Sequence, residues 1–389
     1  MDFKRQIDIS MFKKGLFLLG PRQVGKTYLI EQFLKEKGNV LSYNFNSRAT
    51  YLRLQRQASL FSEEIEAALD KHRFLYLFLD EIQKFPELLD DLQVLLDKHK
   101  NALIPLITGS SARKLRQKKV NLLPGRIHSA KLFPLSFVEL GLLEKNNVGF
   151  EALRKVFKEG LLPGIIRTEK PEEELKYYTD IYLKEEIEAE AITRNLAAFA
   201  HFLSLAAEEL GQLIQYSTLG RDVGLSPPSI KSYYEILEDT LIVHRLDPYL
   251  KKARERLFTG HKFYFFDVGV AQALAQKPID EGRLFENVMI LEIIKQLHYQ
   301  KKKGELYYWR THGGAEVDLV WESPQGLLAC EFKFSSTLHP KDLNGLKSFL
   351  EKYSCKEALV VGLFDKARKI DQRIKVLPIL DFYNDYLLK

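Results

Sequence analysis

The chain has 389 residues, of which 46% are apolar and 28% charged, and its formal net charge is +6. One hydrophobic core rarely serves a chain this long, so we expect two or three domains of ordinary globular composition. Two cysteines exclude a disulfide framework and a zinc cluster and favour a reducing, cytoplasmic setting. We expect no secretion signal and no membrane span, because no apolar stretch reaches ~20 residues.

The first motif lies in GLFLLGPRQVGKTYLI, which predicts a short strand, a glycine loop and a helix. The loop fits G-x-x-x-x-G-K-[ST] without a mismatch. Its backbone N–H groups would bind phosphate at the helix N-terminus, Lys26 would reach the β- and γ-phosphates, and Thr27 would hold Mg²⁺. The alternative is an ordinary glycine turn before a helix. The predicted ATP-binding residues in this motif are Gly20, Pro21, Arg22, Gln23, Val24, Gly25, Lys26, Thr27 and Tyr28.

The next element, FLYLFLDEIQ, predicts a strand buried on both faces that ends in two acids. We expect Asp80 to hold the Mg²⁺ through its water shell at the carboxyl edge of a parallel sheet. Glu81 is then placed to polarise an attacking water, which predicts ATP hydrolysis and not only binding. A solvated acidic pair at a strand end is the simpler alternative.

A third strand, NALIPLITGSS, ends in polar residues, and either Thr108 or Ser110 would sense the γ-phosphate. A basic segment follows, which is either a solvated surface or a phosphate-binding one. In its Leu-Pro-Gly-Arg turn, Arg126 is predicted to be an arginine finger for a neighbouring subunit, which implies a homo-oligomer. The other bases of the segment are Arg113, Lys114, Arg116, Lys118, Lys119 and Lys131.

The middle of the chain predicts a helical connector and then a helix-turn-helix followed by two strands, as in a winged helix. If the second helix enters a DNA groove, Ser229 and Lys231 at its start would contact the DNA. Bases between the two strands would neutralise phosphates. Winged helices also bind proteins, so a protein partner is the alternative. The predicted bases of the wing are Lys251, Lys252, Arg254 and Arg256.

Near the C-terminus, GAEVDLVWESPQGLLACEFKFS predicts a hairpin whose acids share one face. Asp318 and Glu331 would bind Mg²⁺ or Mn²⁺, and Lys333 would orient a water or stabilise charge on the attacked phosphate. An upstream helix offers Glu286 as a further acid. This pattern resembles the core of PD-(D/E)XK nucleases, although an amphipathic hairpin needs no metal.

Taken together, GPRQVGKT, LDEIQ, ITGSS, LPGR, FPLSFVEL and the later YYWRTHGGAEVDLV and CEFKFS resemble a family of prokaryotic AAA-type ATPases with a C-terminal domain of unknown function. One departure is Leu161 after Gly160, where similar proteins have a second glycine. The resemblance implies an α/β chain in four parts: a P-loop AAA-type domain (1–145), a helical lid (146–200), a winged helix (201–275) and a nuclease-like PD-(D/E)XK domain (276–389).

Two functions are compatible with this sequence. The first is a Mg²⁺-dependent ATPase that acts on DNA through the winged helix and the nuclease-like domain. The second is a nucleotide-switched adaptor that binds a protein partner, with the C-terminal domain as an inactive scaffold.

Overall fold

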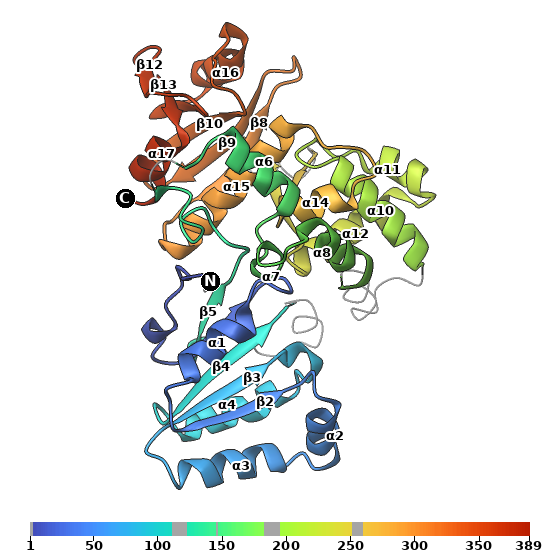
Figure 1. Cartoon of the computed structure of the whole chain (residues 1–389), viewed down its shortest axis with the longest axis vertical. Coiled ribbons are helices and arrows are strands. Elements are labelled where there is room, and N and C mark those ends of the chain that lie inside the picture. The colour runs from blue at the N-terminus through green and yellow to red at the C-terminus, as the bar shows by residue number, and fades with distance from the viewer. Residues whose placement is uncertain (1–2, 111–122, 145–146, 183–194, 251–259) are drawn as a thin grey trace. The chain divides into compact units, whose positions relative to one another are not determined.

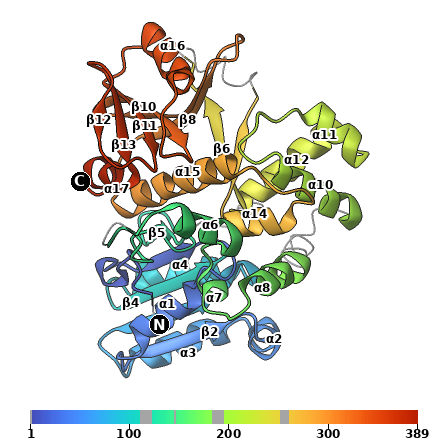
Figure 2. The same ribbon diagram turned by 45° about the horizontal axis from the view of Figure 1, so that its top comes forward.

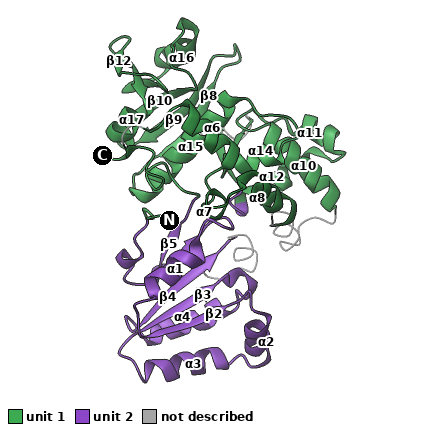
Figure 3. Ribbon diagram, in the orientation of Figure 1, with its two compact units in different colours: residues 1–6, 134–238, 243–389 green, residues 7–133, 239–242 purple. Residues whose placement is uncertain are grey.

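The structure, a computed structural model, describes residues 3–110, 123–144, 147–182, 195–250 and 260–389. It divides into two compact units (Figures 1 and 3). The N-terminal unit comprises residues 7–133 and 239–242, and the C-terminal unit comprises residues 1–6, 134–238 and 243–389.

The N-terminal unit contains a five-stranded sheet in the order β2-β3-β4-β1-β5, and every neighbouring pair is parallel. Its strands are β1 (Leu16–Leu19), β2 (Val40–Asn44), β3 (Leu75–Asp80), β4 (Leu103–Gly109) and β5 (His128–Lys131). Its helices are α1 (Lys26–Leu34), α2 (Arg48–Arg56), α3 (Leu60–Leu69) and α4 (Leu88–Lys98), with short 3₁₀ turns η1 (Ile9–Met11) and η2 (Ile82–Lys84).

The central strands of this sheet are buried on both faces, as their continuous apolar sequences predict. Strand β1 lies between β4 and β5, and β4 separates it from β3. Since all strands are parallel, their carboxyl ends meet at one edge. That edge brings together Gly20 after β1, Asp80 at the end of β3 and Gly109 at the end of β4.

The C-terminal unit contains a mixed eight-stranded sheet in the order β12-β13-β11-β10-β9-β8-β6-β7. Its strands are β6 (Val243–Pro248), β7 (Lys262–Phe265), β8 (Glu305–Arg310), β9 (Glu316–Ser323), β10 (Gly326–Lys333), β11 (Glu357–Gly362), β12 (Arg368–Lys369) and β13 (Ile374–Pro378). Its helices are α6 (Phe150–Glu159), α7 (Pro163–Ile166), α8 (Pro171–Tyr177), α10 (Leu196–Glu208), α11 (Tyr216–Val223), α12 (Pro227–Asp239), α14 (Val268–Leu274), α15 (Glu281–Tyr299), α16 (Asn344–Lys352) and α17 (Ile379–Phe382). Short helical turns are η4 (Tyr178–Tyr182), η5 (Pro340–Leu343) and η6 (Tyr383–Leu387).

The long helix α15 packs against β10 and β7 (Figure 2). It is apolar over most of its circumference, and its charged Glu292 and Lys295 pair with each other at 2.8 Å in the interior. Helix α16 packs against β9, β10 and β11, where Leu346 and Phe349 are fully buried. The predicted β9–β10 hairpin is present, with Ser323 paired to Gly326.

Helices α10 to α12 and strands β6 and β7 form the segment that the sequence predicts as a winged helix. Helix α11 ends at Gly224, whose φ of +75° favours glycine, and α12 begins at Pro227. The two expected strands pair antiparallel, and Tyr234 of α12 stacks on Phe263 of β7 at 4.1 Å between ring centroids. Strand β6 also pairs with β8, so these strands continue the C-terminal sheet.

Gly160 and Leu161, where the sequence departs from the pattern of the family it resembles, lie in the C-terminal unit. Gly160 has a φ of +71°, and a Cβ there would lie 2.2 Å from a carboxylate oxygen of Asp267. The Leu161 N–H donates to Asp267 at 2.6 Å, and the Leu161 side chain is 1% exposed. An apolar side chain at this position therefore fills core volume. Within the described residues, no helix is both long and apolar enough to cross a membrane.

Candidate functional site

The glycine loop after β1 is shaped by close backbone contacts. The Gly20 N–H donates to Gly109 at 3.2 Å, and a Cβ on Gly20 would lie 2.3 Å from the Leu132 carbonyl oxygen, so only glycine fits. Gly25 is the N-cap of α1 with a φ of +92°, a conformation that favours glycine. The loop thus leads directly into the N-terminus of α1, where unpaired N–H groups and the helix dipole attract anions.

The lysine of this loop is held inside it. Lys26 is 4% exposed, and its ammonium donates to the carbonyl oxygens of Gly20 at 2.8 Å and Pro21 at 2.9 Å. The same ammonium lies 3.9 Å from the Glu81 carboxylate. Carbonyl oxygens are weak partners for a full positive charge, so this ammonium is available for exchange to a phosphate.

Hydroxyl groups surround Asp80 at the end of β3. Its Oδ1 accepts hydrogen bonds from Thr27 of α1 at 2.8 Å and from Thr108 of β4 at 2.7 Å. Burial raises the pKa of Asp80 above its usual value, and the two hydroxyl donors act against that rise. A carboxylate and a hydroxyl in contact form the kind of oxygen pair that Mg²⁺ prefers, so these residues fit the predicted ion.

Glu81 occupies a strained position next to Asp80. Its φ of +60° is uncommon for a residue other than glycine, and its N–H donates to the Thr108 hydroxyl at 2.9 Å. Ser110 contacts the Glu81 carboxylate at 3.3 Å. Thr108 thus contacts Asp80 and the backbone of Glu81, whereas Ser110 contacts the predicted base itself.

Sequence reasoning missed Gln83 in this site. Its amide Nε2 donates to the Glu81 carboxylate and to the Ser110 hydroxyl, the latter at 2.9 Å. Its Oε1 is buried and accepts no hydrogen bond within the described residues. An amide two residues after the acidic pair in LDEIQ was the available signal, because a polar side chain buried beside a carboxylate normally hydrogen-bonds to it.

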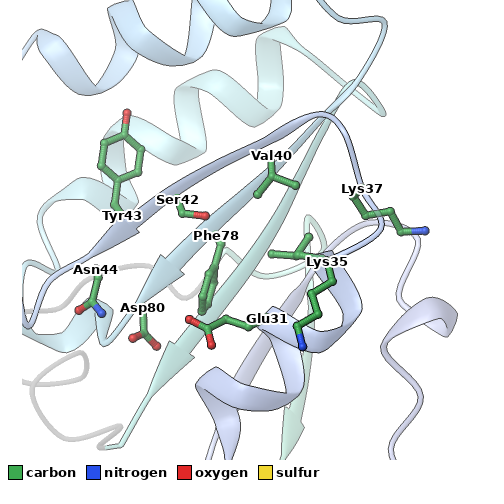
Figure 4. Close-up of a pocket in the computed structure, with 10 residues that line it drawn as sticks. Glu31, Lys35, Lys37, Val40, Ser42, Tyr43, Asn44, Phe78 and Asp80 are labelled. Carbon is green, nitrogen blue, oxygen red and sulfur yellow. The ribbon is translucent and has the colours of Figure 1, made fainter.

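A cavity of about 300 Å³ opens beside this site, lined by residues of α1, β2, β3 and the turn between α1 and β2. Figure 4 shows Asp80 and Asn44 at one end and Lys35 and Lys37 at the other. Asn44 is the register partner of Asp80. Through this cavity, Asp80 can be reached from the side of the sheet where strand β2 lies.

The remaining predicted residues of the loop differ in exposure. Val24 is buried, Arg22 is partly buried, and Gln23 and Tyr28 are exposed. Gln23 also has a positive φ of +61°. An exposed side chain on a phosphate loop leaves the binding to its backbone N–H group.

Arg126 precedes β5, so it lies at the amino ends of the parallel strands, opposite to the glycine loop. It pairs with Asp97 at the end of α4. Both contacts of this bidentate ion pair measure 2.8 Å. It therefore faces away from the nucleotide loop of its own chain, and the role of arginine finger for a neighbouring subunit stays a prediction. Lys131 is exposed at the end of β5. The other five bases of that segment lie outside the described residues.

The C-terminal acids converge as the hairpin predicts. Asp318 accepts the Phe332 N–H at 2.8 Å, and the Lys333 ammonium donates to Glu331 at 2.8 Å. Glu286 of α15 faces the same cluster, and its charge contributes to the raised pKa of Asp318 after burial and Glu331. The expected hairpin buries only its apolar face. Here the acidic face is partly buried too: Asp318 is 8% exposed, whereas the side chains of Glu316 and Lys333 are 27% and 30% exposed.

A second lysine, which the sequence analysis did not single out, lies among these acids. Lys262 of β7 contacts Glu286 at 3.2 Å and forms a shorter ion pair with Glu316. Burial acts to lower the pKa of Lys262, but the charges of Glu286 and Glu316 outweigh it and the pKa is raised. For the acid Glu331, burial acts in the opposite direction and raises the pKa to about 7.

Within the carboxylate cluster formed by Glu286, Glu316, Asp318 and Glu331, the metal-binding role of Asp318 and Glu331 stays a prediction. An ammonium group already lies between Glu286 and Glu316, and a metal ion beside it would be repelled. Across the described ranges, no group of three or more His, Cys, Asp or Glu residues is arranged to hold a metal ion.

At the predicted DNA-binding helix, Lys231 is exposed, whereas the Ser229 hydroxyl contacts the Ser226 hydroxyl at 2.9 Å. The Ser226 oxygen also accepts the Ser229 N–H at 3.4 Å, as an N-cap of α12 does. The same helix also carries Glu235, Glu238 and Asp239. The four predicted bases of the wing lie outside the described residues.

Comparison with known protein families finds three domain models that match successive ranges of the chain. Residues 13–141 match the model of an AAA domain. The N-terminal part is an AAA domain. Its five-stranded parallel sheet is typical of such domains. Residues 150–281 and 281–382 match two domains of unknown function, DUF8612 and DUF4143.

Three relatives of this AAA-domain protein are each described as an uncharacterized protein. A protein of Haemophilus influenzae is 25% identical over 386 residues, which is 93% of this chain and 92% of that protein. Proteins of Mycobacterium tuberculosis and Mycobacterium bovis are each 26% identical over 331 residues, or 83% of this chain and 70% of theirs. The structure of C. elegans PCH-2 aligns with 63% of this chain and 62% of its own, with 13% identity and a TM-score of 0.25, which is too low to support an argument.

Proposed function

We propose that the AAA domain binds ATP with Mg²⁺ and hydrolyses it. The observation that supports this most is the contact between Thr27, Asp80 and Thr108 at the carboxyl edge of the sheet. It joins the end of the glycine loop to the acid-ending strand across 53 residues of sequence. Bound Mg²⁺ would neutralise charge on the β- and γ-phosphates.

The residues of the chain have separate roles in this proposal. The loop from Gly20 to Gly25 wraps the phosphates with its N–H groups. Lys26 exchanges the carbonyl oxygens of Gly20 and Pro21 for phosphate oxygens, a stronger, charge-assisted contact. Thr27 and Asp80 hold the ion. Glu81 accepts a proton from the attacking water, and either Thr108 or Ser110 contacts the γ-phosphate, with Ser110 favoured by its contact to Glu81.

ATP hydrolysis by the purified chain, measured with and without Mg²⁺, tests this proposal. We expect turnover that requires Mg²⁺ and that falls at least about 100-fold in Lys26→Ala. The matched control is Lys71→Ala, which removes an exposed lysine between α3 and β3 and should leave turnover unchanged. Equal turnover of Lys26→Ala and the wild type would contradict the site.

We also propose that Arg126 acts on a neighbouring copy of the chain in a homo-oligomer. Its position at the far edge of its own sheet supports action in trans. Specific ATPase activity should then rise with chain concentration, and Arg126→Ala should remove that rise while keeping ATP binding. Arg53→Ala is the control, because Arg53 is an exposed, ion-paired arginine of the same unit. Activity independent of concentration would refute the role.

For the C-terminal unit we propose DNA binding by the winged helix formed by α10–α12, β6 and β7. The order of these elements, the exposed Lys231 and the bases at Lys251, Lys252, Arg254 and Arg256 support it. Replacing those four bases by serine should weaken DNA binding and flatten its dependence on salt, because fewer counterions are released. Neutralising Lys366, Arg368 and Lys369, which are exposed at β12, is the matched control.

One observation favours the alternative function, a nucleotide-switched adaptor for a protein. Helix α12 carries one lysine and three acids, of which Glu235 is exposed and Glu238 and Asp239 are half-buried, a poor balance for a helix in a DNA groove. An adaptor would form a protein complex that depends on ATP and would show no affinity for DNA at low salt. In both functions we propose that the nuclease-like region is a scaffold that does not cleave DNA. Mg²⁺- or Mn²⁺-dependent cutting that Asp318→Ala or Lys333→Ala abolishes would contradict this.

A further inference from the structure

Lys262 is the first residue of β7 and is 3% exposed. Lysine is almost never buried to this extent unless it is paired. Its ammonium lies 3.2 Å from Glu286 of α15, contacts Glu316 of β9 more closely, and lies 5.7 Å from the ring centroid of Tyr308 in β8. Side chains of α15, β8 and β9, all at least 24 residues from Lys262 in the sequence, therefore meet at one positive charge of β7.

The oxygens around this ammonium already accept other donors. The Tyr264 hydroxyl donates to Glu286 at 2.6 Å, and Arg310 lies 3.3 Å from Glu316. A divalent ion needs several oxygens at about 2.0–2.6 Å and cannot share them with an ammonium at the same place. The cluster is thus built around a cation that the chain itself supplies.

We propose that the ammonium of Lys262 is the resident cation of the carboxylate cluster and excludes divalent metal ions from it. It joins β7 to α15 and β9, independently of ATP hydrolysis. Without it, four carboxylates would face one another with Lys333 as their nearest ammonium. The buried Glu331 Oε2, which accepts no hydrogen bond in the part of the chain that the structure describes, would then be free to bind a metal ion.

The test uses the full chain without nucleotide, in an Asp80→Asn background that removes the predicted Mg²⁺ ligand of the AAA domain. Mn²⁺ binding is followed by electron paramagnetic resonance, and the thermal midpoint is measured with and without Mn²⁺. In the chain that retains Lys262, we expect no bound Mn²⁺ and no change of the thermal midpoint on adding Mn²⁺. The Lys262→Met substitution should lower the thermal midpoint by about 10 °C. This variant should bind one Mn²⁺ per chain, and the bound ion should restore part of the lost thermal midpoint.

Two variants separate this from a general loss of stability. Lys295→Met removes another fully buried lysine, paired with Glu292 of the same helix, and should lower the midpoint without Mn²⁺ binding. Lys262→Arg keeps a cation and should also bind none. Mn²⁺ bound to the chain that retains Lys262, and lost in Asp318→Asn, would overturn the proposal. A folded Lys262→Met chain that binds no Mn²⁺ would overturn it too. If that variant does not fold, Mn²⁺ titrations of the chains with Lys262 and with Lys262→Arg decide. No bound Mn²⁺ in either chain supports the proposal, and Mn²⁺ that binds and is lost in Asp318→Asn overturns it.

Discussion

The AAA domain and the C-terminal sheet each place two carboxylates beside a lysine, but the lysines are used differently. Lys26 is bound by the carbonyl oxygens of its own loop and stays 3.9 Å from Glu81. In the C-terminal cluster, Lys333 contacts Glu331 directly at 2.8 Å and Lys262 adds a second ammonium. The acids of the first site therefore keep room for a new cation, whereas Glu286, Glu316 and Glu331 of the second each contact an ammonium already.

Two sites with the same residue types can therefore differ in their chemistry. A carboxylate that accepts hydroxyl donors, as Asp80 does from Thr27 and Thr108, gains a great deal from a metal ion. A carboxylate already paired with a buried ammonium must lose that contact first, and breaking such a pair is costly. The local partner, and not the acid itself, decides between a reactive site and a structural one.

The largest expected effect is that of Glu81→Gln. The amide cannot accept the proton of the attacking water, so turnover should fall by roughly 100-fold or more while ATP binding is kept. Titration with a fluorescent ATP analogue measures binding and phosphate release measures turnover. Glu331→Gln is the matched change in the other site and should leave turnover intact. Unchanged hydrolysis in Glu81→Gln would remove Glu81 as the base.

A smaller loss is expected for Gln83→Leu. The variant removes the Nε2 donor that contacts Glu81 and Ser110, so Glu81 is less well oriented. We expect kcat to fall about 10-fold with little change in KM, which corresponds to about 1.4 kcal/mol. Gln57→Leu, at an exposed glutamine of the same unit, is the control. A change in KM alone would place Gln83 outside the positioning of Glu81.

The last prediction concerns the effect of pH on stability, which is not expected to alter turnover directly. Because the pKa of Glu331 is raised to about 7 from the usual 4.5, the folded state binds its proton more tightly than the unfolded state does. Stability should therefore fall as pH rises from about 4.5 to 7, by on the order of 1–3 kcal/mol. Glu331→Gln should flatten this slope in denaturant titrations of the chain. Glu305→Gln, at an exposed acid of β8, should leave it in place. An unchanged slope in Glu331→Gln would contradict the assignment.

Much of the AAA domain could be predicted because its signals are local. The glycine loop, the apolar β3 ending in Asp80 and the polar end of β4 are each contiguous, and parallel strands bring such ends to one edge without further information. The β9–β10 hairpin was predictable for the same reason, since a Pro/Gly break separates two alternating stretches.

The partners of these residues were not predictable. Gln83 follows Glu81 by two positions, but its contact with Ser110 depends on the pairing of β3 and β4. Lys262 stands in an apolar strand with no motif around it, and the acids that it meets lie 24 and 54 residues further along the chain. The burial of the acidic hairpin face depends on α15, which covers β10 from outside the hairpin.

The sequence alone thus determined which residues can bind a nucleotide and where the strands and hairpins form, because hydrophobic period, glycine conformation and motif spacing act over a few residues. Only the tertiary structure decided which charge faces which. Electrostatic partners in a folded chain are set by strand order and helix packing, and these bring Glu286, Glu316 and Asp318 to Lys262 while leaving Asp80 with hydroxyl groups.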